Sequence, residues 1–229
     1  MINFVLASNN KKKIAELETL FSTAAAESIK VISLKEIGFT DDIVEDGNSF
    51  EENALIKAST PAKLGHIGIA DDSGLAVDYL NGAPGIYSAR FSGEGATDEG
   101  NRQKLLRELN GISEDKRSAK FVCVAAFVLP ENSGMKIKEE WRISDELSRK
   151  SGISADRAMV VRGECYGTIL NEERGDGGFG YDSLFYYPEF NQTFAEIPAE
   201  RKNAVSHRGN AMREFTRRVN LIIETIGDN

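Results

Sequence analysis

Apolar runs alternate with segments of helical periodicity along the chain. The run at residues 2–7 predicts a short strand, and the longer run at 119–129 predicts a strand buried on both faces. Elsewhere, apolar residues recur at steps of three and four, as in an amphipathic helix. This alternation predicts a mixed α/β core.

The helical periodicity marks several helices. The first follows residues 2–7 and has its apolar positions at Ile14, Leu17, Leu20 and Phe21. The second begins at a capping-box pattern, Ser49 with Glu52, and Pro61 is expected to bend or end it. The third has apolar positions at Leu105, Leu106 and Leu109. The last is long and is expected to pack on the sheet through Met212, Phe215, Val219, Ile222, Ile223 and Ile226.

Two further predictions concern strand boundaries and pairing. Residues 67–70 are expected to form a strand that runs into the sequence DDSG at 71–74, which places two carboxylates at a strand end. Residues 136–141 are expected to pair with 119–129 as the second strand of a hairpin.

Composition and charge predict the number of domains and exclude some classes of partner. A chain of 229 residues, of which 41% are hydrophobic, can bury one substantial core, and we expect a single domain over residues 1–229. The net charge of -8 argues against nucleic acid or an anionic membrane as the principal partner, because both are recognised through a positive field. The start of the chain has no basic n-region and too short an apolar run for a membrane span, so we expect a cytoplasmic protein.

Polar and basic residues follow the first predicted strand: Ser8, Asn9, Asn10, Lys11, Lys12 and Lys13. Where a strand passes into a helix, free backbone N–H groups and the helix dipole favour an anion, and these side chains add further donors. The arrangement suits a triphosphate. An ordinary helix cap followed by a solvated run of lysines has the same composition, so this segment alone leaves both interpretations open.

Acidic residues occur in two separate loops. Glu45 lies in one, and Asp71 with Asp72 lies in the other. Oxygen ligands from separate loops, completed by water and substrate phosphate, are what Mg²⁺ accepts, and a nearby carboxylate can take a proton from attacking water. Aspartate before Ser-Gly is also a common turn residue, which is the structural alternative.

Two later segments could hold a base. In the sequence RGDGGFGYD at 174–182, glycines allow close backbone approach, aromatic rings can stack on a base, and Asp182 can accept a ring N–H. A hairpin loop with Phe179 in the core would look similar. Ahead of the last helix, Lys202, His207 and Arg208 form a donor-rich cluster in which neighbouring cations favour a neutral imidazole. A solvated basic turn is the alternative there.

Taken in order, these segments resemble the inosine triphosphate pyrophosphatase family, the non-standard purine NTP pyrophosphatases. The longest matching motifs are EDGNSFEENA at 45–54, ADDSGLAVD at 70–78 and GAPGIYSAR at 82–90. The resemblance covers nearly the whole chain. It implies an α/β fold with an elongated central mixed sheet flanked by helices, two lobes enclosing a nucleotide cleft, and a homodimer.

The resemblance also implies roles for individual residues. The phosphate-binding loop corresponds to Ser8, Asn10 and Lys13, with Lys57 as a further phosphate contact. Glu45 and Asp72 correspond to the acids associated with Mg²⁺, Asp72 also to the proton acceptor, and Ser73 to a substrate contact. The base-binding residues correspond to Phe179, Gly180, Tyr181, Asp182, Lys202, His207 and Arg208.

The implied reaction is hydrolysis of ITP, dITP and XTP to the monophosphate and pyrophosphate, with Asp72, Lys13 and Lys57 as catalytic residues. Asp72 or its neighbour Asp71 would orient the attacking water. Donors such as Arg208 favour a 6-oxo purine, since the 6-amino group of adenine would leave a buried donor unpaired. Related pyrophosphatases for other modified nucleotides, a phosphatase releasing single phosphates and a non-catalytic nucleotide-binding regulator are the rival interpretations.

The chain departs from the family pattern at three places. Asn9 and Lys12 stand where the phosphate loop often has glycine, and Ser183 replaces a frequent proline. Residues 139–159 are charged, partly helical in pattern and longer than the usual link, which predicts a surface insertion.

Overall fold

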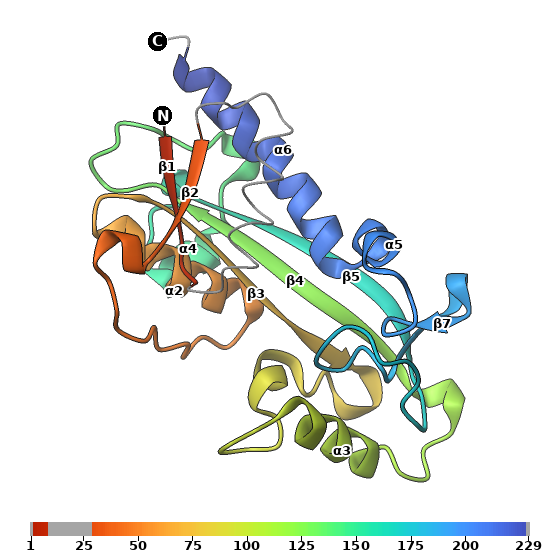
Figure 1. The fold of residues 1–229 in the computed structure, drawn as a ribbon. Helices are drawn as coiled ribbons and strands as arrows, with labels where there is room; N and C mark the ends of the chain where they lie inside the picture. Colours follow the sequence, from red (N-terminus) through yellow and green to blue (C-terminus); the bar gives the residue numbers. More distant parts are fainter. Residues whose placement is uncertain (1, 9–28, 228–229) are drawn as a thin grey trace. The chain divides into compact units, whose positions relative to one another are not determined.

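Residues 2–8 and 29–227 are described in the computed structural model of this chain (Figure 1). The predicted helix that carries Ile14 and Phe21 lies outside these residues, as do the predicted site residues Asn9, Asn10, Lys11, Lys12 and Lys13. Within the described part of the chain, every helix is too short or too polar to span a bilayer.

The described residues form a seven-stranded sheet with the order β2-β1-β3-β4-β5-β6-β7 (Figure 1). Its strands are β1 (Ile2–Leu6), β2 (Ile29–Ser33), β3 (Ile67–Val77), β4 (Ser118–Val128), β5 (Ala158–Ile169), β6 (Phe185–Tyr187) and β7 (Gln192–Thr193). Strand β1 pairs in parallel with β2 and β3, whereas β6 pairs antiparallel with β5 and β7. The sheet is therefore mixed, which confirms the predicted mixed α/β class, while the cleft between two lobes stays a prediction.

Helices flank this sheet. The α-helices are α2 (Phe50–Lys63), α3 (Asp98–Glu108), α4 (Asp145–Ser151), α5 (Ala199–Val205) and α6 (His207–Gly227). Short 3-10 helices connect them at η1 (Lys35–Ile37), η2 (Asp78–Leu80), η3 (Gly85–Arg90), η4 (Glu114–Lys116), η5 (Glu139–Trp141), η6 (Ala155–Arg157) and η7 (Pro188–Phe190). The predicted helices that fall within the described residues are all present.

Local capping chemistry explains where α2 begins. The Ser49 side chain accepts a hydrogen bond from the Glu52 N–H at 3.2 Å, as the capping-box pattern predicts. The Glu52 carboxylate reaches back one residue further than expected and accepts from the Asn48 N–H at 2.8 Å. Pro61 lies inside the last turn, and the helix ends at Lys63.

Two strand predictions are wrong. Residues 136–138 form no strand and 139–141 form η5, so the predicted hairpin partner of β4 does not exist; β5 takes that place in the sheet. Strand β3 continues through Asp71 and Asp72 to Val77, so these carboxylates lie in the middle of a strand and not at its end. At 71–74 strand pairing overrides the local turn-forming tendency, whereas at 136–141 the local strand pattern finds no strand partner.

The chain divides into two compact units. Unit 1 comprises Met1–Asp72, Val124–Arg162 and Ala211–Asn229, and unit 2 comprises Ser73–Cys123 and Gly163–Asn210. Strands β3, β4 and β5 contribute residues to both units. The single domain over residues 1–229 stays a prediction.

The core of unit 1 is built from packed aromatic rings and a close contact between helix and strand. Phe127 of β4 packs against Phe4 of β1, with ring centroids 5.7 Å apart, and against Phe215 of α6, at 6.5 Å. This contact confirms that the last helix packs on the sheet. A Cβ at Gly68 of β3 would lie 1.9 Å from the Ala58 carbonyl oxygen, so glycine is required where α2 crosses β3.

The segment 139–159, predicted as a surface insertion, includes η5, α4, η6 and the start of β5. Its isoleucines Ile143 and Ile153 are buried, and Lys150 of α4 forms an ion pair with Glu52 of α2 at 3.2 Å. The segment therefore packs within unit 1 and contacts the first turn of α2. Whether it is an insertion stays a prediction.

The core of unit 2 surrounds a buried arginine. Arg117 is 2% exposed and donates to three backbone carbonyls: Ile169 O at 2.7 Å, Leu109 O at 2.9 Å and Leu170 O at 2.8 Å. Burial lowers the pKa of this guanidinium. Arg117 thereby ties α3 and β4 to the end of β5.

We expect Arg117→Met to lower the free energy of unfolding by about 2–4 kcal/mol, because the methionine fills the space but leaves buried carbonyls without their donors. Urea unfolding followed by circular dichroism measures the loss as a shift of the midpoint. Arg107→Met, at an exposed position on α3, is the matched control and should change little. An unchanged midpoint in Arg117→Met would contradict the role given to the guanidinium.

Candidate active site

A lysine and two carboxylates meet in unit 1. Lys57 Nζ of α2 lies 2.7 Å from Asp72 Oδ1 of β3 and 3.1 Å from Glu45 Oε2 in the loop before α2. These three residues, the acidic cluster, were all predicted as site residues. The motifs show only the order of these segments along the chain, whereas the structure shows that their side chains are in contact.

Burial controls the electrostatics of the acidic cluster. The side chains of Lys57 and Asp72 are each 12% exposed. Burial raises the pKa of Asp72 above its ordinary value, although Lys57 opposes this by favouring the carboxylate. Burial also disfavours the Lys57 ammonium, but attraction to Asp72 and Glu45 outweighs it, and the pKa of Lys57 is raised.

Asn53 supports the cluster from one turn before Lys57 on α2. Its side chain is 1% exposed, and its Oδ1 accepts from the Gly47 N–H at 2.9 Å. The nearby Asn53 side chain also favours the charged form of Asp72 and so lowers its pKa. Since residues four apart lie on one face of a helix, Asn53 and Lys57 present their polar groups to the same loop and strand. Asn53 was not predicted, although it lies within the matching motif EDGNSFEENA.

Two further predicted site residues, Asp71 and Ser8, lie next to the acidic cluster in the sheet: Asp71 precedes Asp72 in β3, and Ser8 follows β1, which pairs with β3. Successive side chains of a strand point to opposite faces, so Asp71 does not share the face on which Asp72 meets Lys57. This favours Asp72 over Asp71 as the reacting carboxylate. Ser8 follows β1, whose Leu6 pairs with Ile69 of β3, and its N–H donates to Leu6 O at 2.7 Å.

The acidic cluster fits a divalent cation. Two carboxylate oxygens from different elements converge on one positive group, Lys57 Nζ, which marks a position where positive charge is stabilised. Within the described part of the chain, no group of three or more His, Cys, Asp and Glu residues could hold a metal. Mg²⁺ takes one or two carboxylates together with water and phosphate, so the carboxylates of Glu45 and Asp72 suit this cation.

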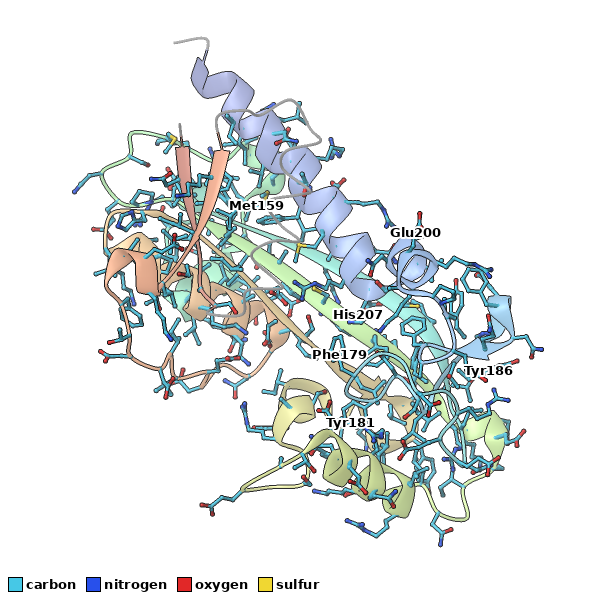
Figure 2. All side chains as sticks on the ribbon, in the orientation of Figure 1. Met159, Phe179, Tyr181, Tyr186, Glu200 and His207 are labelled. Atoms are coloured by element: carbon cyan, nitrogen blue, oxygen red, sulfur yellow. The ribbon has the colours of Figure 1, made fainter. Side chains whose placement is uncertain are left out.

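A cavity of about 170 Å³ lies in unit 2. Seven of the predicted substrate-binding residues line it: Ser73, Phe179, Gly180, Tyr181, Asp182, Lys202 and His207. They come from β3, the loop after β5, α5 and the start of α6, and Figure 2 labels Phe179, Tyr181 and His207 among them. The structure thus brings together segments more than a hundred residues apart in the sequence.

Five residues that line this cavity were not predicted: Gly74, Ser88, Ala89, Asp98 and Phe121. The Phe121 ring stacks on His207, with centroids 4.7 Å apart and planes 16° apart. Phe121 lies in the apolar run of β4, whose composition predicts only buried core residues, so the sequence carries no signal for its position at the cavity. Asp98 follows Thr97, the N-cap of α3, and resembles an ordinary first-turn acid.

The base-binding loop is organised around Asp182. Asp182 Oδ2 accepts from the Phe179 N–H at 2.9 Å and from Lys202 Nζ. Gly178 has φ +75°, and a Cβ there would lie 2.1 Å from Asp182 Oδ2, so the loop can close only with glycine at this position. Because both donors come from the protein, this oxygen holds the loop and Lys202 in place. The ring N–H contact predicted for Asp182 stays a prediction.

The two aromatic residues of the loop have different environments. Phe179 is 76% exposed, so the alternative of a loop with this ring in the core is wrong. Lys202 Nζ lies over the Phe179 ring, 5.1 Å from its centroid. Tyr181 is buried, donates to Ser88 O at 2.9 Å, and has a raised pKa because of burial. Phe179 is available for stacking, whereas Tyr181 anchors the loop.

His207 and Arg208 lie inside the first turn of α6, and not ahead of the helix as expected. His207 reaches the cavity, and Lys202 reaches it from α5. Among the described residues that line the cavity, Arg208 is absent. Its contact with a base stays a prediction.

Comparison with known proteins gives a consistent result. The model of the Ham1 family matches residues 4–218. The chain is 44% identical to the dITP/XTP pyrophosphatase of Desulforamulus reducens over 215 residues, 93% of each chain. It is 41% identical to the dITP/XTP pyrophosphatase of Clostridium perfringens over 222 residues, 94% of this chain and 96% of the relative.

Solved structures agree. A HAM1 protein from Coxiella burnetii is 38% identical, with a TM-score of 0.80 over 95% of this chain and 98% of that chain. A nucleoside-triphosphatase / dITP/XTP pyrophosphatase from Mycobacterium abscessus is 37% identical, with a TM-score of 0.74 over 93% of this chain and 97% of that chain. These matches confirm the family resemblance seen in the motifs, and the chain belongs to the Ham1 family.

Proposed function

We infer that this chain hydrolyses nucleoside triphosphates with non-standard purine bases, ITP, dITP and XTP, to the monophosphate and pyrophosphate. Relatives named dITP/XTP pyrophosphatase support the substrate class over more than nine-tenths of the chain. One observation carries the proposal: Asp72 of the acidic cluster and Ser73 of the unit 2 cavity are consecutive residues of β3. The residue proposed for phosphate chemistry, Asp72, is therefore the direct neighbour in sequence of Ser73, which lines the cavity proposed for the base.

Base selection follows from the donors at the cavity. Hypoxanthine and xanthine carry a 6-oxo acceptor that Lys202, largely buried beside Phe179, can satisfy. Adenine carries a 6-amino donor instead, and a buried donor left unpaired costs about 1–3 kcal/mol, a discrimination of about tenfold to hundredfold. Guanine shares the 6-oxo group, so its exclusion depends on its 2-amino group finding no acceptor or no space.

In the chemical step, water attacks the α-phosphorus and the bond to the oxygen that bridges the α- and β-phosphorus breaks. Asp72 accepts the proton of the water, because burial raises its pKa and so makes the carboxylate a stronger base. Lys57 and Lys13, the latter outside the described residues, stabilise the charge of the departing pyrophosphate. Ser8 and its neighbours Asn9, Asn10, Lys11 and Lys12 contribute further phosphate contacts.

Nucleotide pyrophosphatases of this kind are generally metal-dependent. We assign Mg²⁺ to Glu45 and Asp72, where it would neutralise phosphate charge. Lys57, which lies between the two acids, would then be placed to donate to a phosphate oxygen. The proposal further includes a cytoplasmic location and a homodimer, whose mass analytical ultracentrifugation would measure.

The first test incubates the purified protein and Mg²⁺ with ITP, XTP, GTP and ATP and separates the products by chromatography. We expect monophosphate and pyrophosphate from ITP and XTP, with ATP and GTP turned over at least about tenfold less efficiently. Stepwise release of single phosphates would indicate a phosphatase. Binding of ITP without turnover would indicate a regulator.

A further inference from the structure

Helix α3 holds the backbone of Gly180 from both sides. Asp98 Oδ2 accepts from the Gly180 N–H at 2.8 Å, and Arg102 Nη1 donates to Gly180 O at 3.0 Å. Residues 98 and 102 are four apart and therefore lie on one face of the helix. Gly180 directly follows the exposed ring of Phe179 and itself lines the unit 2 cavity.

The same arginine also fixes the ends of the loop. Arg102 Nε lies 2.8 Å from Glu173 Oε2, and Ser183 Oγ donates to the same oxygen at 3.0 Å. Glu173 and Ser183 flank the segment that carries Phe179. Together Asp98, Arg102, Glu173 and Ser183 form a clasp that joins α3 to both ends and to the middle of the base-binding loop. Ser183, which stands where the family often has proline, therefore contributes a hydrogen bond that proline could not make.

The clasp is not required to build α3. Thr97 already caps the helix, with its Oγ1 accepting from the Gly100 N–H at 3.0 Å, so the Asp98 carboxylate is available for Gly180. Gly180 has φ +60°, and without restraint a glycine populates many backbone conformations. Restraint of its N–H and its carbonyl therefore determines the direction in which the Phe179 ring projects.

We propose that Asp98 and Arg102 are positioning residues that hold Gly180 so that Phe179 and Lys202 are ready to receive a purine base. This rests on the proposed function, in which the unit 2 cavity takes the base. Because the clasp acts on the base and not on the phosphates, its loss weakens substrate binding and leaves the chemical step intact. The signature is a raised KM with unchanged kcat.

Two measurements on Arg102→Ala test the proposal. Hydrogen exchange of the free protein should increase in the peptide that covers residues 173–183 while the rest of the chain keeps wild-type protection. Steady-state kinetics with ITP and Mg²⁺ should show KM raised about tenfold and kcat within about twofold of wild type. Asp98→Ala should behave in the same way.

Conservative and control variants separate positioning from general destabilisation. Asp98→Asn keeps an acceptor for the Gly180 N–H and should retain wild-type exchange and KM. Arg107→Ala removes an exposed arginine from the same helix and should change neither readout.

The outcomes are distinct. Unchanged exchange at residues 173–183 in Arg102→Ala overturns the clasp, and so does a fall in kcat with KM unchanged. If the wild-type protein does not hydrolyse ITP, the proposed function fails instead, and the exchange measurement still decides whether α3 restrains the loop.

Discussion

Replacing Asp72 with Asn is expected to reduce turnover of ITP by about a thousandfold or more. The amide cannot accept the proton of the attacking water, a contribution of about a hundredfold to ten-thousandfold, and it is a poorer ligand for Mg²⁺. The fold should persist, because Asn keeps the shape of Asp and can still accept from Lys57 Nζ, which also retains Glu45. Pyrophosphate release measures activity, and urea unfolding measures stability.

Asp71→Asn is the matched variant, since it makes the same chemical change on the neighbouring residue. The side chains of Asp71 and Asp72 point to opposite faces of β3, so Asp71→Asn should lose much less activity. Near-normal turnover in Asp72→Asn would reject its role. If Asp71→Asn were the inactive variant, the reacting carboxylate would be Asp71 instead.

Replacing Lys57 with Met is expected to lower kcat by about a hundredfold to a thousandfold, through loss of a positive charge that stabilises the leaving pyrophosphate. The variant also leaves Glu45 and Asp72 facing each other without the ammonium between them. Lys63→Met, an exposed lysine near the end of the same helix, is the control and should remain active.

The same variant should alter the pH dependence of kcat/KM. Activity requires the Asp72 carboxylate, which is present above its pKa and lost as pH falls through it. Lys57 lowers this pKa against the larger effect of burial, so removal of Lys57 should raise it. We expect the acid limb of the profile to move to higher pH in Lys57→Met. A limb that stays in place would show that Asp72 is not the titrating group.

Much of the local structure could be predicted from the sequence, because it depends on neighbours along the chain. The Ser49 cap and the amphipathic pattern of α6 each follow from residues within a few positions of one another. The doubly buried strand 119–129 follows from an unbroken apolar run and appears as β4. Ordered motifs likewise identified the family and nominated Glu45, Lys57 and Asp72, which the structure then places in contact.

The wrong predictions concern partners distant in the sequence. Residues 136–141 lie near β4 in the chain, and their pattern predicts a hairpin partner for it, but β5 pairs with β4 across an intervening segment of helices. Asp71 to Ser73 have turn-forming composition, yet they lie within β3. Neither outcome has a local signal, because strand pairing is decided by contacts between segments that only the folded chain brings together.

By itself, the sequence determined the family, the mixed α/β class and the residue types available for phosphate, metal and base. Only the tertiary structure decided their roles: that Asp72 rather than Asp71 meets Lys57, that Asp182 holds Lys202, and that α3 clasps Gly180. The physical reason is that pKa values, hydrogen-bond saturation and loop restraint depend on distance and burial. Distance and burial are set only when separate segments pack together, so they cannot be derived from the spacing of residues along the sequence.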